Sequence, residues 1–255
     1  MSDTVTLNPF KLPHPPIVEA VLDIDCDLPP SLQPSTLESA GREVFGDVYP
    51  IFRKQFIQQA QVTMKPESQP EVVASQGLRS FQFAAPDEKQ IVQIRLDGFS
   101  FNRLAPYGSL DDYLPEISRC WDLFRRIAAP VQIRKISLRY INRITIPTVD
   151  GKVKLSDYLK VSPNLPDGTG LEFSEFFHQH QAGDPAMGIL ANIILASLPP
   201  QDGALPLLLD ISVFKHQRTA PSPFSGWSEQ LESLRRLKNL IFKHSLTDTC
   251  LNLFH

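Results

Sequence analysis

The stretch from Val131 to Pro147 constrains the fold more than any other, because its side chains alternate between apolar and polar along a whole strand. Successive strand side chains face opposite sides of a sheet, so one face is predicted to lie in a core. That face carries Ile136, Leu138, Tyr140, Asn142, Ile144 and Ile146, and the opposite face carries Ile133, Lys135, Ser137, Arg139, Ile141, Arg143 and Thr145. The second face, with its three cations, is the best candidate for a working surface.

A strand predicted over residues 17–27 has the same alternation with the opposite charge. Apolar residues at every second position form its core face, and Glu19, Asp23 and Asp25 share the other face. If this strand lies beside the 131–147 strand, the carboxylates and the cations meet as cross-strand pairs.

These charged faces have three interpretations. They form a structural ladder of ion pairs, or they form a polar groove in which Arg139 and Arg143 bind an anionic or planar ligand, because arginine's planar fork matches carboxylate and phosphate. In the third interpretation, Glu19 or Asp23 is a catalytic acid or base whose pKa is raised by burial. The candidate ligand-binding residues are Glu19, Asp23, Lys135, Arg139, Asn142 and Arg143; for the buried amide of Asn142, hydrogen bonding to the backbone is the simplest role.

The remaining pattern predicts an α+β protein, with a mostly antiparallel sheet and helices packed against it. After the first strand the order is helix, three strands, helix and strand, and the same series then returns roughly 110 to 120 residues later. This order predicts two pseudo-duplicated α-βββ-α-β halves, 1–147 and 153–255, or one continuous domain. The expected strands include 90–103 and a C-terminal strand at 244–254, and a short helix is expected at 154–160.

Recognised chemical motifs are scarce in this chain. His178 and His180 share one face of a predicted strand, a spacing that suits zinc or copper, but no third ligand stands nearby in the sequence, so no metal site is predicted. No phosphate-binding glycine loop, dinucleotide fingerprint or nucleophile elbow occurs, so no cofactor and no catalytic residue are predicted.

Composition narrows the class of protein further. The formal net charge is -3, which disfavours nucleic acid and anionic membranes as partners. The three cysteines lie far apart without metal-ligand spacing, and no window is long and apolar enough to span a membrane. We therefore expect a cytoplasmic protein with buried, reduced cysteines.

Two motifs carry a resemblance to a known family. The opening Pro15-Pro16-Ile17-Val18-Glu19-Ala20 and the central Arg139-Tyr140-Ile141-Asn142-Arg143-Ile144 resemble the P-P-I-x-E-A and R-Y-I-N-x-I motifs of a sporadically distributed, functionally uncharacterised prokaryotic family of about this length. The patchy distribution of that family implies genes that move between genomes, such as phage-defence or toxin–antitoxin loci. It implies no particular chemistry.

The functional hypothesis is a non-enzymatic binding or assembly protein that recognises a protein partner or a small anionic ligand through the face around Arg139 and Arg143. We expect it to self-associate and to bind a product of the same operon, because long strands can pair at their edges. The alternatives are an enzyme with a Glu or Asp acid–base and an arginine anion clamp, and a nucleic-acid-sensing defence component.

Overall fold

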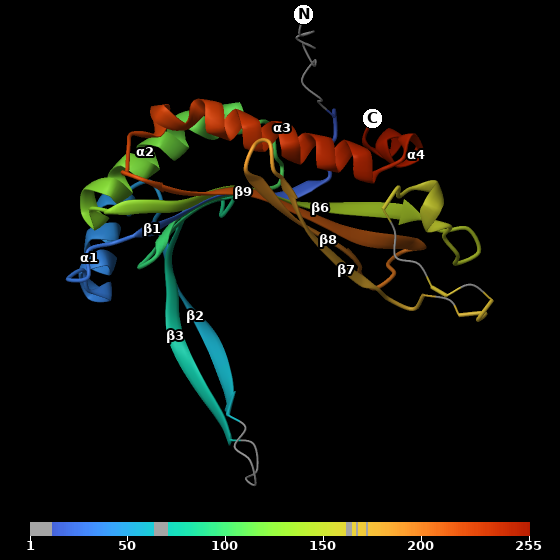
Figure 1. The fold of residues 1–255 in the computed structure, drawn as a ribbon, viewed down its shortest axis with the longest axis horizontal. Coiled ribbons are helices and arrows are strands. Elements are labelled where there is room, and N and C mark those ends of the chain that lie inside the picture. Colours follow the sequence, from blue (N-terminus) through green and yellow to red (C-terminus); the bar gives the residue numbers. More distant parts are fainter. Residues whose placement is uncertain (1–11, 64–70, 162–164, 167, 172) are drawn as a thin grey trace, which may run out of the picture.

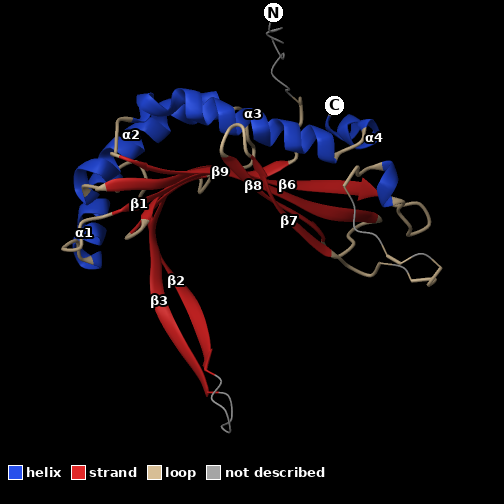
Figure 2. Ribbon diagram, in the orientation of Figure 1, coloured by secondary structure: helices blue, strands red, loops and turns tan. Residues whose placement is uncertain are grey.

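The structure, a computed structural model, describes residues 12–255 except 64–70, 162–164, 167 and 172. It confirms the predicted fold class: an antiparallel sheet of nine strands with helices along one side (Figures 1 and 2). The strands are β1 (Ile17–Asp27), β2 (Ile51–Thr63), β3 (Glu71–Ala84), β4 (Gln90–Arg95), β5 (Gly98–Leu104), β6 (Gln132–Pro147), β7 (Phe177–Asp184), β8 (Ile189–Ser197) and β9 (Ala204–Thr219). The helices are α1 (Pro34–Phe45), α2 (Leu110–Ala128), α3 (Ser228–Ser245) and α4 (Asp248–Leu251).

The two strands that the sequence singled out lie side by side in the middle of the sheet. The strand order is β2-β3-β4-β5-β1-β6-β9-β8-β7, so β1 lies between β5 and β6, and β6 lies between β1 and β9. Because β6 pairs with both β1 and β9, the sheet runs unbroken across the boundary expected near residues 148–152.

The connectivity is symmetric about the β1–β6 pair. On one side β3, β4 and β5 return to β1, and on the other β7, β8 and β9 return to β6. Helices α2 and α3 follow β5 and β9 respectively and lie over the same face of the sheet (Figure 1). This symmetry is partial, because the first side carries a further strand, β2, and the second has the 3-10 turn Leu155–Asp157 in the place of α1. The internal duplication of α-βββ-α-β halves stays a prediction.

The expected series of elements is wrong in three places. Residues 90–103 form two strands, because Leu96 and Asp97 make a tight turn that pairs Arg95 with Gly98. The expected helix at 154–160 is a single 3-10 turn, Leu155–Asp157. The expected last strand is helical, since the Thr247 hydroxyl accepts a hydrogen bond from the Cys250 amide and starts α4.

One residue of the central strand also lies on the other face from the one expected. Ile133 is fully buried in the core, whereas strict alternation places it with Lys135. The ladders of β6 with both neighbours shift register next to this residue, and such an irregularity reverses the facing of the side chains beyond it.

Apolar side chains between the sheet and the helices form the core. Helix α2 begins with a capping box in which Ser109 and Asp112 exchange hydrogen bonds with each other's backbone amides. Its buried face places Trp121 against Phe99, Phe124 and Trp227, with ring centroids 5.0 to 5.7 Å apart. The cysteines Cys26, Cys120 and Cys250 are free and buried, as predicted, and no described helix is long and apolar enough to cross a membrane.

Lys238 on α3 is an unusual member of this core. Its ammonium lies 3.8 Å from the centre of the Tyr140 ring, and the side chain is almost completely buried. Burial, together with the positive charge of Arg235, lowers the pKa of Lys238 to about 7. No described carboxylate forms an ion pair with this ammonium, so Tyr140 is its main electrostatic compensation.

The buried lysine predicts a pH-dependent gain of stability on substitution. Because the pKa of Lys238 is lower in the folded chain than in the unfolded chain, its cost is complete below about pH 7 and shrinks as the pH rises toward 10.5. Lys238→Met should therefore raise the free energy of unfolding by about 1–3 kcal/mol at pH 6, and by less at pH 8.5. Urea denaturation at both pH values measures this, with the exposed Lys160→Met as control. An equal gain at both pH values would contradict it.

Candidate functional site

The candidate site lies on the side of the sheet opposite the helices, which we call the open face. Cross-strand register fixes its members: Asp23 lies opposite Ser100 on β5 and Ser137 on β6, and Val21 lies opposite Arg139. In Figure 1 the β2–β3 hairpin bends away from the helices and borders this side of the sheet. The open face therefore holds every predicted site residue except Asn142.

Cross-strand pairing of the β1 and β6 charges occurs at two positions, of which one joins candidate site residues of the open face. At the other, the Arg134 guanidinium lies 3.1 Å from Asp27 near the end of the two strands. The Lys135 ammonium lies 2.6 Å from a carboxylate oxygen of Asp25, its register partner. Arg139 and Arg143 instead donate hydrogen bonds to Asp210 and Gln201, which lie outside β1. Of the charges expected to form an ion-pair ladder between these two strands, only Lys135 and Asp25 pair with each other.

Arg139 forms the most complete ion pair of the open face. Its Nε and Nη2 donate to both oxygens of Asp210 on β9, at 2.9 and 2.5 Å. The Asp210 side chain is only 5% exposed, whereas that of Arg139 is 48% exposed. Such bidentate pairing compensates for burial of the carboxylate, and the hydrogen bond to Asp210, with the charge of that carboxylate, raises the pKa of Arg139.

A second cluster surrounds Arg95 on β4. Its guanidinium contacts Asp23 at 2.8 Å, Asp25 at 3.0 Å and Asp97 at 2.9 Å. Burial raises the pKa of Asp23 above its ordinary value. Burial also pushes the pKa of Asp25 upward, but the hydrogen bond and charge of Lys135, with the charge of Arg95, hold it below its ordinary value.

A relay of hydrogen bonds, made by three uncharged residues and the carboxylate of Glu19, extends the polar layer toward β3. Glu19 accepts a hydrogen bond of 2.6 Å from the Asn102 amide, whose oxygen accepts one of 3.1 Å from Gln93. Gln93 in turn accepts one of 3.3 Å from the Ser80 hydroxyl. Ser80 and Asn102 are buried although no described helix covers them. The polar groups here satisfy one another, as buried polar groups must.

The other two predicted residues occupy distinct surroundings. Arg143 is exposed and donates to the side-chain oxygen of Gln201 at 3.0 Å. Asn142 faces the core and donates to the backbone oxygens of Tyr140 and Leu209, at 3.2 and 2.9 Å. The side-chain amide of Asn142 thus makes the backbone hydrogen bonds that were the simplest role expected for it.

Sequence reasoning omitted Arg95, Asp210 and the uncharged members of the relay from the candidate site. Asp210 could have been found from the sequence, because it is the single charged residue within the apolar run from Leu205 to Val213. A lone carboxylate in such a run indicates a buried, paired charge. Arg95 had only alternation with Val92 and Ile94, which does not reveal its partners.

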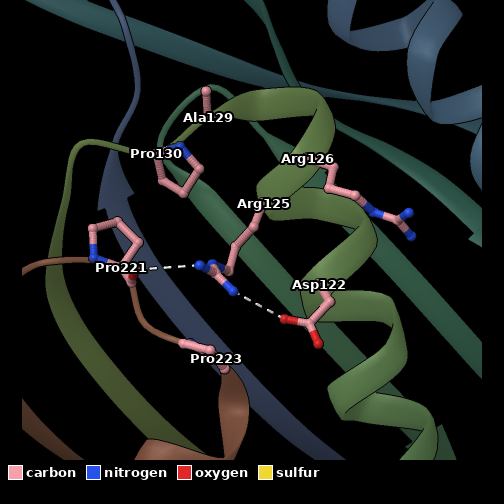
Figure 3. A pocket seen from close by; sticks show the side chains of 7 residues that line it. All are labelled: Asp122, Arg125, Arg126, Ala129, Pro130, Pro221 and Pro223. Carbon is pink, nitrogen blue, oxygen red and sulfur yellow. Dashed lines mark hydrogen bonds and ion pairs between the residues drawn. The ribbon is translucent and has the colours of Figure 1, made fainter.

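The helix side also carries an open hollow of about 450 Å³, between the C-terminal end of α2 and the segment 221–223 (Figure 3). Arg125 donates to Asp122 and to the carbonyl oxygen of Pro221, so its charge is already compensated. Arg126 points away from the prolines (Figure 3). The hollow therefore presents no uncompensated group that converges on a ligand.

Comparisons with protein-family models, with curated proteins and with solved structures find no match. The fold and the site define an α+β protein with a helix-covered face and a polar, internally paired open face. Within the described ranges, no three histidine, cysteine, aspartate or glutamate side chains are grouped to hold a metal ion.

The Arg139–Asp210 pair predicts a sharp difference between two arginines of one strand. Arg139→Ala leaves the Asp210 carboxylate buried without a partner, so the free energy of unfolding should fall by about 2–3 kcal/mol. Arg143→Ala removes an exposed contact and should change it by less than about 0.5 kcal/mol.

Urea denaturation of both variants measures this difference. Adding Asp210→Ala to Arg139→Ala should restore part of the loss, since the unpaired charge is then gone. Equal losses for the two single variants would contradict a structural role for Arg139.

Proposed function

We propose that this chain is a non-enzymatic binding protein that engages a protein partner through its open face. The observation that carries the proposal is a difference in depth. Two arginines of β6 reach the surface: Arg139 is half exposed above a buried Asp210, and Arg143 is exposed. Arg95 on β4 differs, because it is more buried than the carboxylates that it contacts. A partner approaching the sheet meets guanidinium groups first. Its complementary surface is therefore acidic.

Apolar side chains flank the arginines on the β7–β8 side of the open face. Phe177 and Leu190 lie there, with 68% and 40% of their surface exposed. Exposed aromatic residues and arginines are the residue types that dominate binding energy at protein interfaces. These two residues are the anchors that we assign to the partner's apolar groups.

The geometry favours a protein partner over a small anion. An anion clamp needs Arg139 and Arg143 free at once, but both nitrogens of Arg139 that face Asp210 are already engaged. A small anion would have to displace a carboxylate that has almost no contact with water, which is costly. A protein surface can instead use the exposed part of both guanidinium groups without breaking that pair.

The proposal includes the setting expected from the sequence. We propose a cytoplasmic protein that self-associates and binds a product of its own operon, within a mobile phage-defence or toxin–antitoxin locus. The buried, free cysteines support a reducing compartment. The outer strands β2 and β7, each paired on one side only within the described chain, support self-association through a sheet edge.

The test is retention of a partner from a lysate of the native organism on immobilised variants. Arg143→Glu reverses an exposed charge and Phe177→Ser removes an exposed anchor, so each should lower the yield of the retained protein at least about tenfold. Arg126→Glu makes the same charge reversal on exposed α2 and should leave the yield unchanged. All three positions are exposed, so the variants should fold.

Two outcomes would contradict the proposal. Equal retention by all variants, or loss with Arg126→Glu alone, would place binding outside the open face. Retention that nuclease abolishes and that falls steeply with salt would favour the nucleic-acid alternative.

An enzyme remains the second candidate, because the pKa values of neighbouring Asp23 and Asp25 are displaced in opposite directions. Opposed carboxylates of this kind serve as acid and base in many active sites. The binding proposal predicts that Asp23→Asn retains the partner with wild-type yield, since this side chain pairs with Arg95 and not with Arg139 or Arg143. A substrate turned over by the wild type and not by Asp23→Asn would favour the enzyme.

A further inference from the structure

Strand β7 carries a pair of histidines that the open face does not use. His178 and His180 are two residues apart, so their side chains share one face of the strand. Their register partners, Leu195 and Ile193, belong to the face that the helices cover. The two imidazole rings are close, with centroids 4.1 Å apart.

Neither imidazole is held by the rest of the described chain. The Nδ1 atom of His178 is buried and has no hydrogen-bond partner, and His180 is exposed. Buried polar atoms are almost always paired, so this unpaired imidazole nitrogen is available to a ligand. Two imidazoles at this spacing suit zinc, which binds histidine nitrogens at about 2.0–2.1 Å.

The two histidines cannot complete a zinc site alone. Structural zinc takes four protein ligands, and the described residues contain no third candidate near this pair. The edge on which they stand supplies a route to more ligands. β7 is the last strand of the sheet and pairs only with β8 in the described chain, so its outer backbone groups can receive another strand.

We infer that one Zn²⁺ ion joins two copies of this chain through antiparallel β7–β7 pairing. Pairing centred on Gln179 places His178 opposite the partner's His180 and the reverse, with all four on one face. Opposite Cβ atoms in such a pair lie about 4.5–5.5 Å apart, so four imidazoles converge on one tetrahedral ion. Each copy lacks half of the site.

Zinc-mediated pairing of two copies also fixes where their open faces lie. A two-fold axis through Gln179 and perpendicular to the sheet keeps both open faces on the same side of one continuous sheet. Phe177, which neighbours His178 and faces the open side, then lies near the junction of the two copies. The inference rests on the proposed self-association and adds the metal and its ligands.

The test uses tag-free protein, stripped with EDTA and then given one zinc ion for every two chains. Light scattering during size-exclusion chromatography measures the mass, and native mass spectrometry counts the zinc. We expect the mass to double on zinc addition, with one zinc per two chains, for the wild type and for His216→Ala, which alters an exposed histidine of β9. His178→Ala and His180→Ala should keep the single-chain mass under the same conditions.

Any of three other results would contradict the zinc-mediated dimer. Zinc bound without a doubling of mass would mean that one copy holds it alone. A dimer that forms in EDTA, and forms equally well with either histidine variant, would support self-association without zinc. Doubling by His178→Ala or His180→Ala as readily as by the wild type would place the metal elsewhere.

Discussion

The antiparallel pairing of β1 with β6 is the constraint on which the rest of the structure depends. Each strand brings its own meander to the sheet, through β5 on one side and β9 on the other, so this one ladder unites the two parts of the chain. The apolar faces of both strands pack against the helices, so their polar faces lie side by side on the open face. The central register, with Asp23 opposite Ser137 and Asp25 opposite Lys135, thus sets the position of every charge on the open face.

The polar groups of a sheet face need hydrogen-bond and ion-pair partners within the protein before that face can bind another molecule. Here Arg95 contacts three carboxylates, Arg139 contacts Asp210, and the chain from Ser80 to Glu19 joins four strands by hydrogen bonds. Such networks are fixed in geometry because each unmet bond is costly in a poorly hydrated site. The result is a rigid layer of paired charges in which Arg95 is largely buried, with the outer part of Arg139 and the exposed Arg143 at its surface. That arrangement suits a preorganised binding surface, since little side-chain entropy remains to be lost.

Alternation in the sequence was sufficient to predict the class of fold, the two central strands and the faces of most of their residues. It failed where a local irregularity outweighed periodicity, as at Ile133, and where a two-residue turn divided 90–103. The helical C-terminus was missed because Thr247 supplies a cap that alternation does not register. The partners of Arg139 and Asp23 could not be predicted, because Asp210 and Arg95 come from strands far away in sequence whose order only the folded sheet fixes.

The central claim is that the open face is a binding surface, and hydroxyl-radical footprinting tests it most directly. The measurement compares side-chain oxidation in the free chain and in the complex with the partner that it retains. The account predicts protection of the exposed apolar residues Phe177 and Leu190, with unchanged oxidation of Val131 and Leu253, which are exposed outside that face. Protection of Val131 or Leu253 with no change at Phe177 and Leu190 would contradict it.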